Sequence, residues 1–309
     1  MKKLKLPNHK VKQQKTVLTV AIFIILCIYF ISLMIPIVWA IYSSFNDKFA
    51  YAAYYVRRMA FPTKLTFDNF RVALTKYSFT ATTTQLQYNF FEMIGFSLIY
   101  TIGCAFFFTL TPCLVAYCAA RFKFRFSKVL YAFVIVTMSL PIVGSMPSEI
   151  RMLKAISDNV PIIGQYIGYD TFPGMFILRM NFLSINFLIF YAQFSMIPMT
   201  YSEAAKVDGA SNFRIMTTVI LPQAIPTITT VFLLSFIAFW NDYQIPLVYL
   251  PSYPTVSEGL FTFISGESAI NYTPIKMAGF IGLTVPLVTV FAILNKYLRL
   301  NVATGGIKG

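Results

Sequence analysis

The stretch TYSEAAKVDGASNFRIMTTVILP, at residues 200–222, decides the fold, because it is a polar segment enclosed by apolar runs. Thr200 and Glu203 have the spacing of a capping box, which predicts a helix that starts at Tyr201. The pair Asp208-Gly209 should end this helix, since glycine readily adopts the left-handed conformation found after a helix C-terminus.

A second short helix is predicted after the glycine. Ser211 can cap its first turn, and its apolar residues are Phe213, Ile215, Met216 and Val219. Pro222 should stop it, because proline has no backbone N–H to continue a helix. Two short helices that meet at a glycine turn would form a compact knob. By spacing alone, the segment is equally compatible with an ordinary connector at the membrane surface.

The composition of the whole chain predicts a polytopic membrane protein. Hydrophobic residues make up 57% of the 309 residues and charged residues only 12%. An average soluble domain is roughly 45–50% apolar and about a quarter charged. The net charge of +14 is then read as a bias of basic residues toward cytosolic segments, and nucleic acid is not expected as a partner.

Six apolar runs are long enough to cross a bilayer, which requires about 20 residues. The predicted spans cover about 17–42, 93–120, 129–150, 172–197, 223–250 and 277–297. The first run is too long for a signal peptide, so we expect an uncleaved span. The chain would then consist of a basic tail at 1–16, a six-span domain at 17–297 and a tail at 298–309. The loop 198–222 joins spans 4 and 5.

The basic residues predict which side of the membrane this loop faces. Six spans place both termini on one side, and that side carries fifteen Lys and Arg residues against nine on the other, with Arg179 omitted because it lies within a span. Short segments rich in Lys and Arg stay in the cytosol. Both termini and the loop 198–222 should therefore be cytosolic.

Residues for catalysis or metal binding are scarce. The four cysteines lie inside apolar runs without metal-like spacing, and the single histidine, His9, lies in the basic tail. These residues predict neither a metal site nor a catalytic triad. No GxxxxGK[ST] motif is present, so this chain cannot cradle the phosphates of ATP by that loop. Energy from ATP would have to come from another polypeptide.

The loop resembles the EAA loop of binding-protein-dependent ABC importer permeases. The matching residues are Glu203-Ala204-Ala205, Asp208-Gly209 and Leu221-Pro222, with Val219 in place of the usual isoleucine. Other segments resemble the carbohydrate (maltose-type) subfamily that lacks a large external domain: Phe61-Pro62 with residues 65–70, Ala116-Tyr117 with residues 119–122, Trp240-Asn241-Asp242 with Pro246-Leu247, and the tail 305–309. The external stretch 43–91 matches least well.

The resemblance implies an all-α membrane protein with the six transmembrane helices of the ABC importer permease fold and a cytosolic coupling helix between spans 4 and 5. It implies a permease subunit, multi-pass in the bacterial plasma membrane, that forms the path for a carbohydrate such as an oligosaccharide. Its partners would be a second permease in a heterodimer, two ATPase subunits that hold ATP and Mg²⁺, an extracellular sugar-binding protein, and lipid. The chain itself would bind no cofactor and would not be an enzyme.

The same resemblance assigns the coupling residues. Glu203 would be a charged contact with the ATPase, Ala204 and Ala205 a closely packed surface, and Gly209 the turn. Asp208, Leu221 and Pro222 complete the motif. We refer to residues 198–222 as the coupling loop.

The substrate path is less sharply marked by the sequence. Trp240, Asn241 and Asp242 are candidates, because an ionisable residue inside a span usually faces protein or water. A structural hydrogen bond between helices explains Asp242 equally well. Glu149 and Arg179 lie near predicted span ends, where snorkelling toward water accounts for them.

Two other kinds of transporter share much of this pattern. One is an ABC permease for a solute other than sugar. The other is an ion-coupled secondary transporter, which often has internal repeats and its own ion ligands. The sequence has no evident repeat, and Asp242 is the one credible buried ion ligand. An intramembrane enzyme would need paired catalytic groups that the spans lack.

Overall fold

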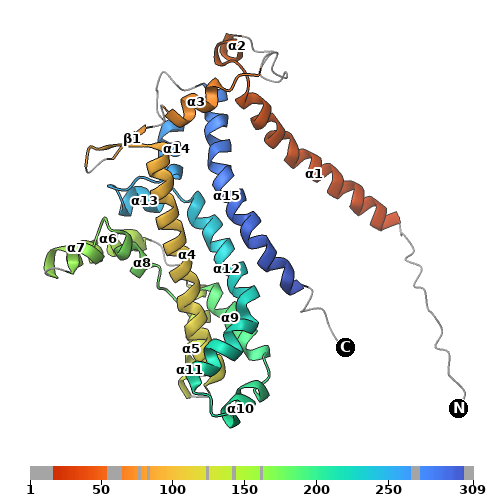
Figure 1. Cartoon of the computed structure of the whole chain (residues 1–309), viewed down its shortest axis with the longest axis vertical. Coiled ribbons are helices and arrows are strands. Elements are labelled where there is room, and N and C mark those ends of the chain that lie inside the picture. The colour runs from red at the N-terminus through yellow and green to blue at the C-terminus, as the bar shows by residue number, and fades with distance from the viewer. Residues whose placement is uncertain are drawn as a thin grey trace, which may run out of the picture.

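The computed structural model describes residues 17–53, 65–75, 78–81, 84–122, 125–140, 144–160, 163–265 and 272–302. The predicted basic tail at 1–16, the matches at Phe61-Pro62 and residues 305–309, and His9 lie outside these residues. The described chain is almost entirely helical (Figure 1).

The elements follow one another as α1 (Val17–Ser44), α2 (Lys48–Ala53), α3 (Asp68–Thr75), β1 (Ser78–Thr80), β2 (Gln87–Asn89), α4 (Phe90–Arg121), α5 (Arg125–Ser139), α6 (Ser145–Asn159), α7 (Gly164–Ile167), α8 (Phe172–Leu178), α9 (Ile185–Met196), α10 (Thr200–Val207), α11 (Asn212–Ile215), a π-helical turn (Met216–Ile220), α12 (Leu221–Asn241), α13 (Gln244–Tyr249), α14 (Val256–Ser265) and α15 (Thr273–Val302). The two strands form an antiparallel hairpin in which Phe79 faces Tyr88.

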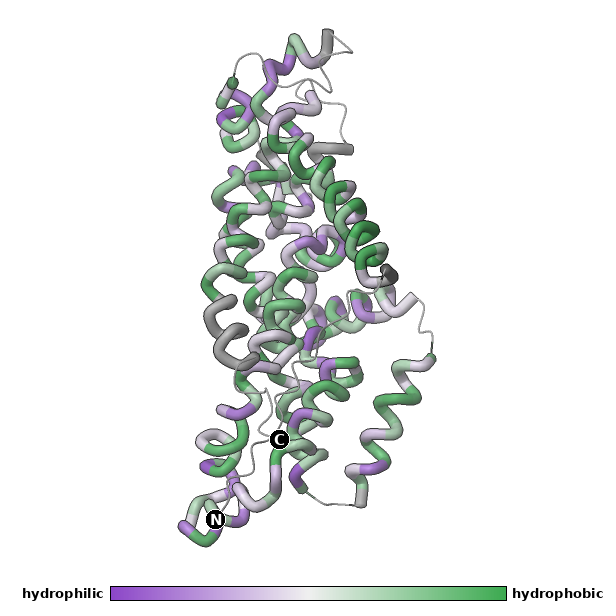
Figure 2. The backbone as a smooth tube through the Cα atoms, turned by 90° about the vertical axis from the view of Figure 1, so that its right-hand side faces the viewer, coloured by the Kyte–Doolittle hydropathy of each residue, from purple (hydrophilic) through white to green (hydrophobic). Residues whose placement is uncertain are grey.

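Four helical segments of the described chain are long and apolar enough to cross a membrane: 19–44, 90–121, 212–241 and 273–293. Two shorter apolar helices, Phe126–Ser139 and Ile185–Met196, lie where spans 3 and 4 were predicted. The long helices are strongly apolar along most of their length (Figure 2). The predicted number of apolar segments is thus found, but three of them differ from the predicted spans.

The third and fourth predicted spans are each divided. The third was expected to reach residue 150, but α5 ends at Ser139 and a new helix, α6, starts after Gly144, whose φ of +82° is left-handed. The fourth was expected as one helix over 172–197, but it breaks into α8 and α9. Between them, the Asn181 side chain accepts a hydrogen bond from the Leu183 N–H at 2.8 Å. A turn closed by a side chain in this way competes with helical hydrogen bonding.

The fifth predicted span also ends early. It was expected to continue to residue 250, but α12 stops at Asn241. The Asp242 carboxylate accepts hydrogen bonds from the backbone N–H groups of Gln244 and Ile245, at 3.0 and 3.2 Å, and so caps a separate helix, α13. Aspartate at such a position satisfies N–H groups that no helical carbonyl can reach.

Helix α4 is the central element, and α9 and α12 pack along it. Helix α1 lies apart from this bundle and contacts α15, as Figure 1 shows. Its attachment is completed by Asn69 of α3, whose amide donates to the carbonyls of Ser44 and Asn46 at 2.8 and 2.7 Å. Helices α1 and α15 both extend from the end that holds α3 toward the end that holds α10 (Figure 1).

Candidate functional site

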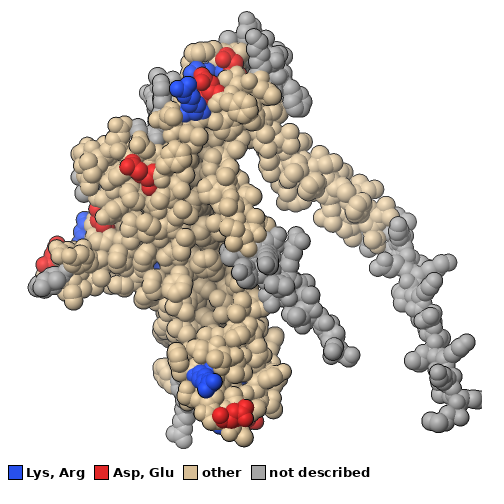
Figure 3. Space-filling model, viewed as in Figure 1, with Lys and Arg blue, Asp and Glu red and all other residues tan. Residues whose placement is uncertain are grey.

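Helix α10 projects from one end of the molecule and carries the first coupling residues. None of its residues is buried. Glu203 and Ala204 are exposed, whereas Ala205 is half-buried against the core beneath the helix. In the space-filling view, acidic and basic atoms gather at this tip, below a long stretch with few charges (Figure 3). The residues predicted to meet an ATPase are therefore accessible from outside the chain.

The turn after α10 is fixed by Gly209, as the sequence predicted. Gly209 has φ +77°, a value that disfavours any residue with a Cβ atom. Its N–H donates to the carbonyl of Lys206 at 3.0 Å, and the N–H of Ala210 donates to the carbonyl of Ala205 at 2.9 Å. This pair of hydrogen bonds is the Schellman motif, with Asp208 at the helix end.

The capping predictions have mixed outcomes. Ser211 does cap α11, since its hydroxyl oxygen accepts a hydrogen bond from the Arg214 N–H at 3.3 Å. The capping box at Thr200 and Glu203 is wrong. The helix begins at Thr200 itself, so the residue at the cap position is Met199, which has no side chain suited to capping. Because Thr200 lies inside the first turn of α10, its hydroxyl oxygen is not placed to accept a hydrogen bond from the backbone N–H groups of that turn.

The prediction that Pro222 stops the second helix is also wrong. Pro222 lies in the first turn of α12, and residues 212–241 form one continuous helical segment. The preceding turn is π-helical, and the Leu221 N–H donates to the carbonyl of Met216, five residues earlier. A wider turn accommodates proline, whose ring would otherwise collide with the carbonyl four residues before it. The coupling loop is therefore mechanically continuous with a transmembrane helix.

A buried cluster supports the coupling loop from below. It includes Phe194, Ile215, Ile220 and Ala224, and Leu221 packs against it. These side chains come from α9, α11, the π turn and α12, so the loop is packed onto the two helices that it joins. Apolar packing of this kind resists bending of the loop relative to the membrane helices.

Arg121, the last residue of α4, joins the loop to the central helix. Its side chain is only 7% exposed. One guanidinium nitrogen, Nη1, donates to the carbonyl of Ile197 at 2.9 Å and contacts the sulfur of Met199 at 3.1 Å. In the sequence, Arg121 is recognisable only as one of the basic residues expected on the cytosolic side. Its place in the matching segment at residues 119–122 was the one signal that could have singled it out.

The three substrate-path candidates have different surroundings. Trp240 is buried, stacks on Phe236 and donates from its indole N–H to the carbonyl of Leu283 at 3.3 Å. It joins α12 to α15. Asp242 lies just beyond the end of α12 and not deep within a span. Besides capping α13, it accepts a hydrogen bond from the Tyr100 hydroxyl at 3.4 Å.

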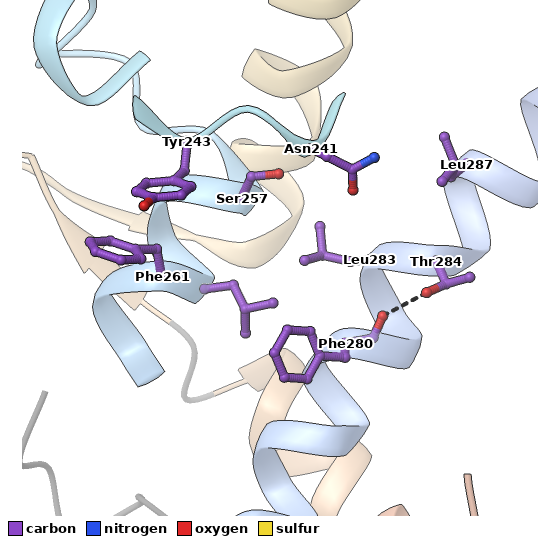
Figure 4. Close-up of a pocket in the computed structure, with 9 residues that line it drawn as sticks. Asn241, Tyr243, Ser257, Phe261, Phe280, Leu283, Thr284 and Leu287 are labelled. Carbon is purple, nitrogen blue, oxygen red and sulfur yellow. Dashed lines mark hydrogen bonds between the residues drawn. The ribbon is translucent and has the colours of Figure 1, made fainter. Parts of the chain in front are cut away.

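Asn241 faces a different region from Asp242. It lines a cavity of about 310 Å³ between the end of α12, α14 and α15 (Figure 4). Tyr243 and Phe261 stack at 4.1 Å on one wall, and Phe280 and Leu283 form the opposite wall. The Asn241 amide N–H₂ donates back to the carbonyl of Ile237 at 2.8 Å. The sequence candidates are thus not brought together in one site.

Two charged residues that were attributed to snorkelling are half-buried and contact other side chains. Arg179 follows α8, and its Nε and Nη2 atoms are buried. Its guanidinium lies over the ring of Phe239, 5.8 Å from the centroid. Glu149 accepts a hydrogen bond from the buried hydroxyl of Tyr249 at 2.7 Å. Both residues thus interact with other parts of the protein, close to the breaks in the predicted spans 3 and 4.

Glu258 of α14, outside the apolar spans, is the carboxyl group most affected by burial. It is 1% exposed and exchanges long hydrogen bonds with Thr255 at the start of that helix. Burial raises the pKa of Glu258 to about 7, against the weaker opposite effect of the Thr255 N–H.

Comparison with known proteins identifies the family. A family model described as "Binding-protein-dependent transport system inner membrane component" matches residues 113–303, which include the whole coupling loop. The chain belongs to this family. It is therefore a multi-pass, helical membrane component of a transport system, as the EAA-like residues indicated.

One relative matches nearly the whole chain and another matches about two thirds of it. The melibiose/raffinose/stachyose import permease protein MelC of Bacillus subtilis is 27% identical over 296 residues, 95% of this chain and 96% of the relative. The trehalose/maltose transport system permease protein MalG of Thermococcus litoralis is 29% identical over 201 residues, 63% of this chain and 68% of that protein. A bacterial ABC transporter involved in the import of alginate shares the fold, with a TM-score of 0.69 at 19% identity over 92% of this chain and 98% of that one.

Proposed function

We propose that this protein is the transmembrane permease subunit of an ATP-driven sugar importer. The observation that carries the proposal is the rigid, exposed coupling loop, which is capped at Gly209 and continuous with α12. A loop of this kind transmits a displacement from a protein outside the membrane to a helix within it. The family gives the transport role, since its members are inner membrane components of binding-protein-dependent systems.

A carbohydrate, most simply an oligosaccharide, is the solute that the relatives favour. One of them is named for melibiose, raffinose and stachyose, and another for trehalose and maltose. All of these sugars are oligosaccharides. A third relative, in Thermoanaerobacterium thermosulfurigenes, is named for starch degradation products and is 24% identical over 97% of this chain.

The importer would contain several other proteins. Two ATPase subunits would bind ATP and Mg²⁺ and contact Glu203, Ala204 and the turn at Gly209. A second permease would pair with this chain as a heterodimer, and an extracellular binding protein would deliver the sugar. Both termini would be cytosolic, on the side of the coupling loop. This chain would contribute no enzymatic activity.

The coupling loop suggests how ATP would drive transport. Closure of the ATPase subunits on ATP would displace α10 as a rigid body, because its C-terminus is fixed by the Schellman hydrogen bonds and its base by Arg121. The displacement would pass through the π turn into α12. Movement of α12 against α4 and α9 would then alternate access to the path, as rigid-body rearrangements do in other transporters.

Energy coupling tests the proposal against its main rival. Cells that carry the complete importer should lose sugar uptake when the partner ATPase is inactivated, and should keep it when an uncoupler collapses the proton gradient but ATP is maintained. An ion-coupled secondary transporter would instead keep uptake without the ATPase and lose it with the uncoupler. That result would overturn the proposal. A panel of labelled oligosaccharides, monosaccharides and amino acids in the same assay separates a sugar permease from one for another solute.

A further inference from the structure

Arg179 is a half-buried cation that forms no ion pair with a described residue. It lies at the start of the break between α8 and α9, and its Nε and Nη2 atoms are buried and make no hydrogen bond with any described residue. Its guanidinium lies over the ring face of Phe239 on α12, at 5.8 Å from the centroid. A cation gains from an aromatic face, but hydrogen-bond donors left unpaired in the interior are costly.

An anion lies directly beyond the C-terminal end of α12. Asp242 follows Phe239 by three residues, and its N–H donates to the Phe239 carbonyl at 3.3 Å. Both residues also contact Tyr100 of α4, Phe239 through an edge-on ring contact at 6.0 Å and Asp242 through the 3.4 Å hydrogen bond. That bond is long, so the carboxylate oxygen is weakly held.

We propose that Arg179 is a positioning residue that alternates between two places on α12, the Phe239 ring in this structure and the Asp242 carboxylate in another state of the transport cycle. Three residues of helix correspond to a rise of about 4.5 Å, at 1.5 Å per residue. A slide of α12 past α8 by less than one turn therefore exchanges the ring for the carboxylate. One-turn shifts of packed elements between two discrete arrangements are an established kind of switch.

Each arrangement provides partners for the Arg179 guanidinium and for the Asp242 carboxylate. In this structure the ring stabilises the cation, while Tyr100 and the backbone of α13 hold the carboxylate. In the shifted arrangement the guanidinium gains a carboxylate and the carboxylate gains a full charge partner, an interaction that is strong away from water. Because Arg179 has a favourable partner in each arrangement, the contact between Arg179 and α12 has two stable states. The inference rests on the proposed function, since α12 is the helix that would receive force from the coupling loop.

Glu149 is the other carboxylate near this site, and it provides a matched control. The buried Tyr249 hydroxyl donates to it at 2.7 Å, a shorter bond than the one from Tyr100 to Asp242. It comes from α6, which is separate from α12, so sliding α12 would not carry it to Arg179. An ion pair with Glu149 would be insensitive to the register of α12.

Charge reversal in the complete importer tests the pairing. Arg179→Asp and Asp242→Arg should each reduce ATP-dependent uptake by about tenfold or more, and the double variant should recover to within about threefold of wild type, because paired residues are not additive. Arg179→Asp with Glu149→Arg should not recover. Lys154→Gln, which removes a cation from the ring of Tyr169 elsewhere, should leave uptake unchanged. Rescue by Glu149→Arg and not by Asp242→Arg would overturn the proposal.

Cysteine cross-linking measures the two arrangements without relying on activity of the variants. The pairs Arg179→Cys with Phe239→Cys, and Arg179→Cys with Asp242→Cys, are placed in a Cys104→Ser chain, because Cys104 lies in the same buried cluster. Their yields in the assembled importer should change in opposite directions between nucleotide-free and ATP-trapped samples. Equal or unchanged yields, in an importer whose wild type takes up sugar with ATP, would overturn the register switch alone. A wild type without ATP-dependent uptake would instead contradict the proposed function.

Discussion

Helices α1 and α10 are both exposed, yet their exposure has different consequences. The apolar window of α1 is entirely unburied within the chain, and α10 has no buried residue either. The surface of α1 is apolar and suits hydrocarbon, where it needs no protein partner. The surface around α10 is mixed, with Glu203 beside Val207, which is 88% exposed, and with Phe213 of α11 at 71%. Apolar side chains exposed to water indicate a surface that binds another protein.

Helices α10 and α1 also differ in how they are attached to the rest of the protein. Helix α10 is held at its end by the Gly209 hydrogen bonds and at its base by Arg121 and a buried cluster. Helix α1 is held by α15 and by the Asn69 hydrogen bonds at one end. On the proposed function, the helix that transmits force is supported at both ends, whereas a helix that lies in lipid can be attached at one end. Four variants test this difference.

The largest effect is expected from Gly209→Pro. Proline fixes φ near −65°, whereas Gly209 has φ +77°, so the turn cannot form. We expect sugar uptake and transport-coupled ATP hydrolysis to fall by about 100-fold, which corresponds to about 2.7 kcal/mol. Gly95→Ala is the control, since a Cβ atom there meets nothing within 4 Å. Normal uptake by a correctly inserted Gly209→Pro protein would show that the turn is not needed.

Arg121→Ala should have the next largest effect. It removes the donor to the Ile197 carbonyl and leaves the base of α10 unsupported. We expect destabilisation by about 1–3 kcal/mol, measured by thermal unfolding in detergent, and uptake reduced by about tenfold. Arg121→Lys should retain part of the stability and part of the uptake. Lys128→Ala, an exposed charge nearby in sequence, is the control, and equal losses in the two alanine variants would contradict a specific role for Arg121.

Glu203→Arg separates coupling from stability. Glu203 is exposed and is not buried by any other element, so thermal unfolding should change by less than about 0.5 kcal/mol. Uptake should nevertheless fall by about fivefold, because the charge that we propose to contact the ATPase is reversed. Asp158→Arg makes the same charge change on exposed α6. The interpretation fails if both variants transport alike, or if Glu203→Arg unfolds at a lower temperature.

The smallest effect on uptake is expected at the attachment of α1. Asn69→Ala leaves the carbonyls of Ser44 and Asn46 without their donor, which should destabilise the protein by about 1–3 kcal/mol. Uptake should fall less than in the coupling variants, because α1 transmits no force. Asn159→Ala removes an exposed asparagine and should be nearly neutral. A larger loss of uptake in Asn69→Ala than in Arg121→Ala would reverse the comparison.

Local rules predicted the parts of the coupling loop that depend on single residues. Gly209 and Ser211 were predicted correctly, because the left-handed turn and the hydroxyl cap require little beyond their immediate neighbours. Pro222 was predicted wrongly because a π turn, which no simple spacing rule signals, removes the clash that should have ended the helix.

The interior of the protein was harder to predict than the loop. Hydropathy located the apolar runs but not the breaks between α5 and α6 and between α8 and α9, where a left-handed glycine precedes α6 and an asparagine side-chain turn precedes α9. Arg179 follows α8 and Glu149 lies in α6, so both are close to these breaks. Once a span is broken, a residue assigned to its outer end can lie inside the protein. The contact of Arg179 with Phe239 depends on two distant segments meeting, which periodicity does not record.

The packing of α1 against α15 has a consequence for biosynthesis. Helix α1 leaves the ribosome long before α15, which it contacts, so its place in the folded protein exists only after α15 has been made. Asn69, its polar attachment, is made more than twenty residues after the end of the helix. In the interval α1 must remain stable in the bilayer alone, with no help from its eventual neighbours. It is the most apolar of the four long helices, and this composition keeps it stable in lipid until the later helices are inserted.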